Sequence, residues 1–68
     1  MTIVLNGQQR ELVPGETVAA ALRALGLQPD ARGVAVAVDG EVVPRSDWET
    51  VALAEGARVE VLTAMQGG

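Results

Sequence analysis

The sequence predicts an α+β fold in which a mixed sheet is crossed by one main helix. Three observations predict it: short segments of alternating apolar residues in both halves, one segment with helical periodicity between them, and turn signals at the junctions. A chain of 68 residues buries a modest core and forms one domain. We therefore expect a folded domain over residues 1–63 and a flexible tail over residues 64–68.

The first hairpin is predicted near the start of the chain. Residues 1–6 alternate as a half-buried strand does, with Met1, Ile3 and Leu5 on one face and Thr2, Val4 and Asn6 on the other. Gly7-Gln8-Gln9 is suited to a hairpin connection, and residues 10–13 then form the second strand. Pro14-Gly15 ends that strand, because proline has no amide hydrogen to donate within a sheet.

A single helix is expected over residues 18–25. Thr17 is placed as its N-cap, with the hydroxyl accepting a hydrogen bond from an amide of the first turn. Gly26 can adopt the left-handed conformation of a helix end, and Leu27 can then fold back on the last turn. Apolar residues recur at the spacing of one helical face: Val18, Ala21, Leu22 and Leu25.

A second hairpin follows the helix. Val34–Val38 is β-branched at every second position, and Asp39-Gly40 is a type I′ turn signal that leads into Glu41–Val43. Valines occupy one face of the first of these strands and alanines the other, and the small face permits close approach of the helix or of a neighbour. The sequence leaves open which face meets the helix.

The last third of the chain holds a helical turn and a final strand. Pro44 ends the preceding strand, and Ser46-Asp47-Trp48-Glu49 has the form of a capping box, so a helical turn is expected to begin at Ser46 with Trp48 packed on the core. Glu55-Gly56 is a turn signal before a strand over residues 58–62, with Val59 and Val61 inward. The ββαββ order is typical of the β-grasp, or ubiquitin-like, fold.

The composition excludes several classes of function. The chain has no Cys, no His and no Lys, so it lacks thiolates, the commonest zinc ligands and the side chain that titrates near neutrality; catalysis by this chain alone is not expected. Its net charge is -4 without a basic cluster, which argues against nucleic-acid binding. Its apolar runs fall short of the ~20 residues that span a bilayer, and the start lacks a basic segment of a signal peptide. We expect a cytoplasmic protein.

The final residues are the candidate chemical site. Residues 63–68 span at most ~20 Å when extended, and Gly67 and Gly68 carry no side chain to block passage through a narrow cleft. The Gly68 carboxylate could be activated by reaction with ATP, which gives an acyl-adenylate whose leaving group is AMP, and the acyl-adenylate could then accept sulfur. A chain without Cys, His or Lys would not intercept that intermediate. Coding bias explains the missing lysines as well, and a frayed terminus explains the glycine pair.

Residues 3–7, 34–48 and 53–68 closely resemble segments of the sulfur carrier of thiamine biosynthesis, the ThiS family. The specific combination is Val-Pro-Arg ending at Arg45, a tryptophan three residues later, and the terminal glycine pair. The resemblance implies that Gly68 is the adenylation and thiocarboxylate site and that Gly67 is needed for threading.

The resemblance also implies partners and no stably bound cofactor. A ThiF-like adenylating enzyme uses ATP, a cysteine desulfurase system supplies sulfur, and a ThiG-like thiazole synthase receives it. Leu62, Met65 and Gln66 are candidate partner contacts, although Leu62 could equally pack beneath the turn that holds Trp48. Pro44, Arg45 and Trp48 have simple structural interpretations as a strand stop, a solvated cation and a cover of the core.

Three alternatives stay open. The small subunit of molybdopterin synthase shares the fold and the glycine pair, but the Val-Pro-Arg and tryptophan signature and the lack of Phe disfavour it. A ubiquitin-like protein modifier would share the activation chemistry and end in an isopeptide bond. A β-grasp interaction domain without chemistry would leave its C terminus unmodified.

Overall fold

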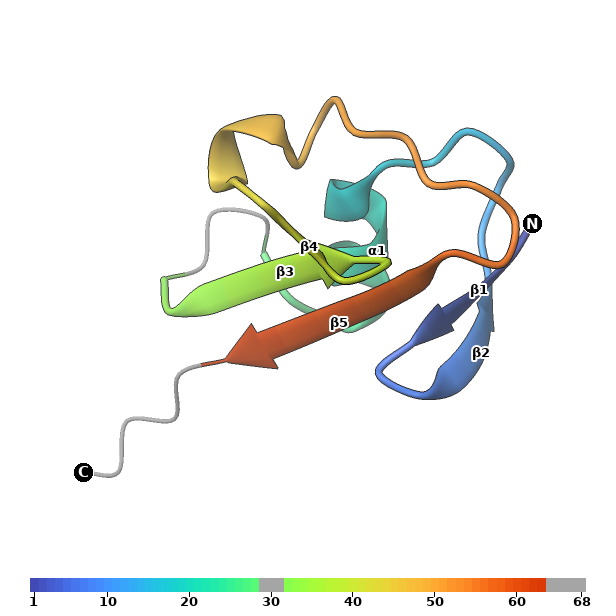
Figure 1. Ribbon diagram of the computed structural model, residues 1–68, viewed down its shortest axis with the longest axis horizontal. Coiled ribbons are helices and arrows are strands. Elements are labelled where there is room, and N and C mark those ends of the chain that lie inside the picture. The colour runs from blue at the N-terminus through green and yellow to red at the C-terminus, as the bar shows by residue number, and fades with distance from the viewer. Residues whose placement is uncertain (29–31, 64–68) are drawn as a thin grey trace.

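In the computed structural model, which describes residues 1–28 and 32–63, one five-stranded sheet packs against one helix (Figure 1). The expected division into residues 1–63 and 64–68 falls at the end of the described chain, and the tail lies outside it. The elements in chain order are β1 (Thr2–Leu5), β2 (Gln8–Glu11), α1 (Val18–Ala24), β3 (Val34–Val38), β4 (Glu41–Val43), the 3-10 turn η1 (Arg45–Asp47) and β5 (Arg58–Thr63).

Strand β5 lies between the two hairpins and joins them into one sheet of order β2-β1-β5-β3-β4 (Figure 1). It runs parallel to β1, with Leu5 opposite Val59, and antiparallel to β3, with Val36 opposite Val61. The predicted mixed sheet is thus confirmed. Parallel neighbours need a long crossover, and here the whole chain between β1 and β5 supplies it.

The first turn differs from the prediction. Asn6-Gly7 connects the strands as a two-residue turn with φ of 50° and 83°, and Leu5 pairs with Gln8. The expected connection Gly7-Gln8-Gln9 and a strand over residues 10–13 are therefore wrong. A type I′ turn matches the twist of the strands, and Asn tolerates positive φ, so the tighter connection forms. The predicted Asp39-Gly40 turn has the same form, with φ of 51° and 86°.

The core lies between the sheet and α1. The valine face of β3 meets it, and Val36 is 2% exposed. Its alanine face is turned outward, which decides the question that the sequence left open. No helix within residues 1–28 and 32–63 is long and apolar enough to cross a membrane. The buried core residues are Ile3, Leu5, Val18, Ala19, Ala21, Leu22, Val36, Val43, Trp48, Leu53, Ala57, Val59 and Val61.

Tertiary contacts cap the N-terminal end of α1. Thr17 is the N-cap residue, as predicted, but its side chain makes no capping hydrogen bond. Instead, the amide of Val18 donates to the carbonyl of Val51 at 3.1 Å, and the amide of Ala19 donates to that of Trp48 at 2.9 Å. The first amides of the helix are satisfied by backbone that lies far away in sequence, so the hydroxyl is not needed.

The C-terminal end of α1 follows the prediction, although the helix ends one residue earlier, at Ala24 with Leu25 as C-cap. Gly26 has φ of 79°, and its amide donates to the carbonyl of Arg23 at 2.9 Å. The amide of Leu27 donates to the carbonyl of Leu22 at 2.9 Å. These two bonds form the Schellman ending that Gly26 and Leu27 predicted.

The turn before Trp48 begins earlier than expected. Pro44 is the N-cap of η1 and Arg45 its first residue, with no side-chain capping bond, so the predicted capping box from Ser46 is wrong. The amide of Asp47 donates to the carbonyl of Pro44 at 2.9 Å, which starts the turn before Ser46 is reached. The predicted packing of Trp48 is confirmed, because its side chain is 2% exposed.

Candidate functional site

The candidate site lies where β5 leaves the sheet. Leu62 is on the outer face and is 71% exposed, so the alternative that it packs beneath the Trp48 turn is excluded. Thr63 is the last residue that the structure describes. The other predicted site residues, Met65, Gln66, Gly67 and Gly68, lie outside the described residues. Leu62 is therefore the predicted site residue that the structure places.

A shallow apolar groove of about 130 Å3 lies beside Leu62 on the outer face. Its floor is the alanine face of β3, where Ala35 pairs with Leu62 and Ala37 pairs with Val42 across the neighbouring strands. Val42 is 77% exposed and stands on the β4 side. Leu62 and Glu60 stand on the β5 side. A side chain from another molecule could enter between these two walls.

The rest of the outer face is more polar. On the β1–β2 half, Thr2 pairs with Glu11 and Val4 pairs with Gln9. The hydroxyl of Thr2 donates a hydrogen bond to the Glu11 carboxylate. Water therefore meets polar groups on that half, as is usual for a solvated sheet face. The apolar surface of the outer face is concentrated on the β3–β4 half, beside the C-terminal end of β5.

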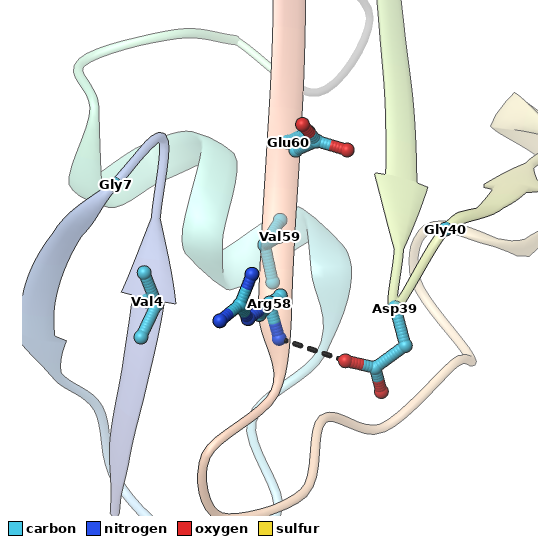
Figure 2. Close-up of a pocket in the computed structure, with 7 residues that line it drawn as sticks. All are labelled: Val4, Gly7, Asp39, Gly40, Arg58, Val59 and Glu60. Atoms are coloured by element: carbon cyan, nitrogen blue, oxygen red, sulfur yellow. Dashed lines mark hydrogen bonds between the residues drawn. The ribbon is translucent and has the colours of Figure 1, made fainter.

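A larger hollow, of about 570 Å3, lies at the opposite end of β5 (Figure 2). There the Asp39 carboxylate accepts a hydrogen bond from the amide of Arg58 at 3.0 Å, and the amide of Asp39 donates to the carbonyl of Arg58 at 2.8 Å. Figure 2 shows that this carboxylate is turned toward the β5 backbone. It therefore joins the turn between β3 and β4 to the start of β5 rather than facing a ligand. In the described part of the chain, no group of His, Cys, Asp and Glu could hold a metal ion.

The residues of the central signature have structural roles. Pro44 follows the last residue of β4, as expected of a strand stop. The Nε1 of Trp48 donates to the carbonyl of Val43 at 2.9 Å. Arg45 is exposed, as expected of a solvated cation, and its guanidinium carbon also lies 5.0 Å from the centre of the Trp48 ring, at the distance of a cation–π contact. This part of the signature stabilises the turn that covers the core.

Comparison with known proteins decides the family. The model of the ThiS family matches residues 3–68. The chain belongs to the ThiS family. This is a family of small carrier proteins.

Solved structures of ThiS proteins share the fold. The crystal structure of the thiamine biosynthesis protein ThiS from Geobacter metallireducens is 30% identical and superposes with a TM-score of 0.79, each chain being covered completely. A solution structure of a thiamine biosynthesis protein from the same organism is also 30% identical, with a TM-score of 0.74 over 100% of this chain and 88% of the other. The β-grasp prediction is thereby confirmed, and the thiamine carrier is favoured over the molybdopterin alternative.

A thiazole synthase from Paramagnetospirillum magneticum is 38% identical over 68 residues. The match covers all of this ThiS-family chain and 20% of the synthase, so the chain spans one-fifth of that relative's length.

Sequence reasoning identified Leu62 but not the groove beside it, whose lining includes Ala35, Ala37 and Val42. The signal was present in the alternation of alanine and valine along β3. It could not be used, because the sequence did not show which of the two faces is covered by α1.

Proposed function

We propose that this ThiS-family chain carries sulfur on the C-terminal carboxylate of Gly68. A carboxylate oxygen attacks the α-phosphate of ATP and releases pyrophosphate, which gives an acyl-adenylate. Hydrosulfide then attacks the carbonyl carbon, AMP leaves, and the product is a thiocarboxylate. If the sulfur arrives as a persulfide, its attack releases AMP and gives an acyl disulfide, and a thiol reduces that S–S bond to release the same thiocarboxylate. The observation that carries this proposal is the family match over residues 3–68, which includes the glycine pair.

The chain acts in this cycle as substrate and donor. The sequence contains no Cys, His or Lys that could serve as a nucleophile or as a neutral-pH base. The proposed catalysts are a ThiF-like adenylating enzyme, with ATP as its substrate, and a cysteine desulfurase system that delivers the sulfur. We place the cycle in the cytoplasm, where ATP is available.

The proposed acceptor is a thiazole synthase of the ThiG type. Support comes from the Paramagnetospirillum protein named thiazole synthase, one-fifth of which matches this whole chain. Joining a carrier segment and a synthase in one polypeptide raises their effective concentration and favours their encounter. The same encounter between separate chains requires a docking surface.

Four residues are proposed to serve the partners directly. Gly67 lets the tail enter a narrow cleft of the partner enzyme, because any side chain at this position would make the tail wider. Met65 and Gln66 contact the walls of that cleft. Leu62, exposed beside the end of β5, contacts the surface of the activating enzyme.

Intact-protein mass spectrometry tests the proposal. After incubation with the activating enzyme, ATP and a sulfur source, the protein should gain the mass difference of one sulfur replacing one oxygen. Removal of Gly68 should abolish the gain and leave thermal unfolding unchanged, because the core residues lie between Ile3 and Val61. A gain that persists without Gly68 would refute the carboxylate assignment, and covalent conjugates with other proteins would indicate a protein modifier instead.

A further inference from the structure

The two hairpin turns of the sheet share their residue types as well as their geometry. Asn6-Gly7 and Asp39-Gly40 each place a short carbonyl side chain directly before a glycine, and all four residues have positive φ. Gly7, Asp39 and Gly40 line the same hollow at the start of β5 (Figure 2). All four turn residues are exposed, so water reaches both turns. Each turn therefore meets the basic requirements for a reaction between a side chain and the backbone amide that follows it.

An asparagine that precedes a glycine can lose its side-chain amide. The glycine nitrogen gives its proton to hydroxide and attacks the side-chain carbon Cγ, so that a new C–N bond forms. The Cγ–Nδ2 bond then breaks, and ammonia leaves with a proton from water. Water opens the resulting succinimide ring at either carbonyl and gives aspartate or isoaspartate. Glycine has no Cβ to crowd the attacking nitrogen, and Asn6 is the one asparagine of the chain, so Asn6-Gly7 is the pair suited to this reaction.

In the folded chain the attacking nitrogen is free, but the attacked group is held. The Gly7 amide has no hydrogen-bond partner within residues 1–28 and 32–63, and a Cβ added at Gly7 would meet nothing within 4 Å. The Asn6 side chain is bound at both polar atoms: its Oδ1 accepts from the Val61 amide at 2.8 Å, and its Nδ2 donates to the Val61 carbonyl at 3.2 Å. Ring closure brings Cγ onto the Gly7 nitrogen, so both bonds to β5 must break first.

We infer that Asn6-Gly7 is a deamidation site of this chain and that the two hydrogen bonds to Val61 keep it unreacted while β5 stays paired with β1. Reaction follows a local opening at this point of the sheet. The same opening is visible at the Val61 amide, which loses its acceptor when the Asn6 side chain leaves. The inference is independent of the carrier chemistry proposed above.

Deamidation weakens the contact that prevented it. Aspartate keeps the acceptor for the Val61 amide but loses the donor to the Val61 carbonyl. Isoaspartate adds one backbone carbon to a two-residue turn whose register sets Leu5 opposite Gln8. Strands β1 and β5 pair over two residues each, so the loss of a neighbouring contact matters for this short parallel pair. The modified chain therefore holds β5 less firmly, on the strand that leads to residues 64–68.

Mass spectrometry of the intact chain measures the reaction as the exchange of a side-chain NH2 for OH, and peptide mapping locates it. The folded chain should react at least about tenfold more slowly than the same chain in urea at the same pH and temperature. In urea, Asn6→Gln should remove the gain, because its longer side chain would have to close a six-membered ring. A gain that persists and maps to another residue would overturn the site, and equal folded and unfolded rates would overturn the protection.

Hydrogen exchange at the Val61 amide connects the protection to its cause. Folding should slow this exchange and the deamidation of Asn6 by factors that agree within about threefold, because one opening exposes both groups. Deamidation much faster than the exchange allows would show that the side chain reacts without leaving Val61. Deamidation slowed far more than the exchange would show that the turn backbone prevents the reaction. Either result would overturn the role of the two hydrogen bonds.

Asp39→Asn supplies a matched turn in the same molecule. The introduced amide also precedes a glycine at nearly the same φ, but the side chain at position 39 has one hydrogen bond to β5, from the Arg58 amide, where Asn6 has two. In urea both positions should react at similar rates. In the folded chain position 39 should react about threefold faster or more, since one bond fewer holds it. Equal or slower reaction at position 39 would overturn the inference, because turn geometry would then suffice.

Discussion

The side-chain amide of Asn6 pairs with both backbone groups of Val61. Its Oδ1 accepts from the Val61 amide at 2.8 Å, and its Nδ2 donates to the Val61 carbonyl at 3.2 Å. The backbone amide of Asn6 also donates a hydrogen bond to the carbonyl of Val59 at 2.9 Å. Asn6 therefore continues the hydrogen bonds between β1 and β5 beyond the end of β1. These bonds stabilise the strand that leads to the candidate site.

Asn6→Asp should lower the free energy of unfolding by about 1–3 kcal/mol. The carboxylate keeps the acceptor for Val61 but loses the donor, and it places negative charge against a carbonyl. Urea unfolding measures the change. Gln9→Glu makes the same exchange of amide for carboxylate at an exposed residue of β2 and should stay within about 0.5 kcal/mol. Equal effects of the two variants would contradict the pairing of Asn6 with Val61.

Trp48→Ala should lower the free energy of unfolding by about 3 kcal/mol or more, because it leaves a cavity in the core. Trp48→Phe should cost less, since it keeps most of the buried ring and loses mainly the hydrogen bond to Val43. Thermal and urea unfolding measure both. The fraction that stays folded should still gain sulfur. An unchanged melting temperature together with lost partner binding would show that Trp48 is a contact rather than a packing residue.

Asp39→Ala should destabilise the protein by about 1–2 kcal/mol, because Ala removes the acceptor for the Arg58 amide and tolerates a φ of 51° poorly. Asp39→Asn should be nearly neutral, since Asn keeps a side-chain oxygen and adopts positive φ readily. Urea unfolding compares the two variants. Glu41→Gln controls for the loss of one nearby negative charge. If Asp39→Asn were as harmful as Asp39→Ala, charge rather than turn geometry would be responsible.

Gly67→Val should slow activation of the carrier without changing its stability. A β-branched side chain restricts φ and ψ and must enter the proposed cleft, whereas Gly67→Ala should have an intermediate effect. The rate of sulfur gain in the intact mass is the measurement, and urea unfolding is the control. A Gly67→Val protein that is activated at the normal rate would refute threading while leaving the role of Gly68 untouched.

Part of the candidate site was predictable. The alternation of β5 placed Leu62 outward, and its exposure agrees, because period-two patterning fixes the sides of a strand once one side is buried. The groove beside it was not predictable. Its floor depends on which face of β3 meets α1, and that is a contact between elements that the strand sequence does not encode.

The sequence by itself determined the features that rest on local interactions. The Asp39-Gly40 turn, the helical stripe, the ending at Gly26 and the inward Val59 and Val61 all formed as predicted. In each case the deciding contacts or dihedral preferences lie within a few residues of one another.

Only the tertiary structure decided the features whose partners are distant in the chain. Carbonyls of Trp48 and Val51 cap α1 in place of the Thr17 hydroxyl, and Asn6 turns the chain where it can pair with Val61. Burial of the valine face left the alanine face to form the groove. A local pattern shows that a backbone amide needs a partner or that a strand has two faces, but the packing of remote segments selects the partner and the face.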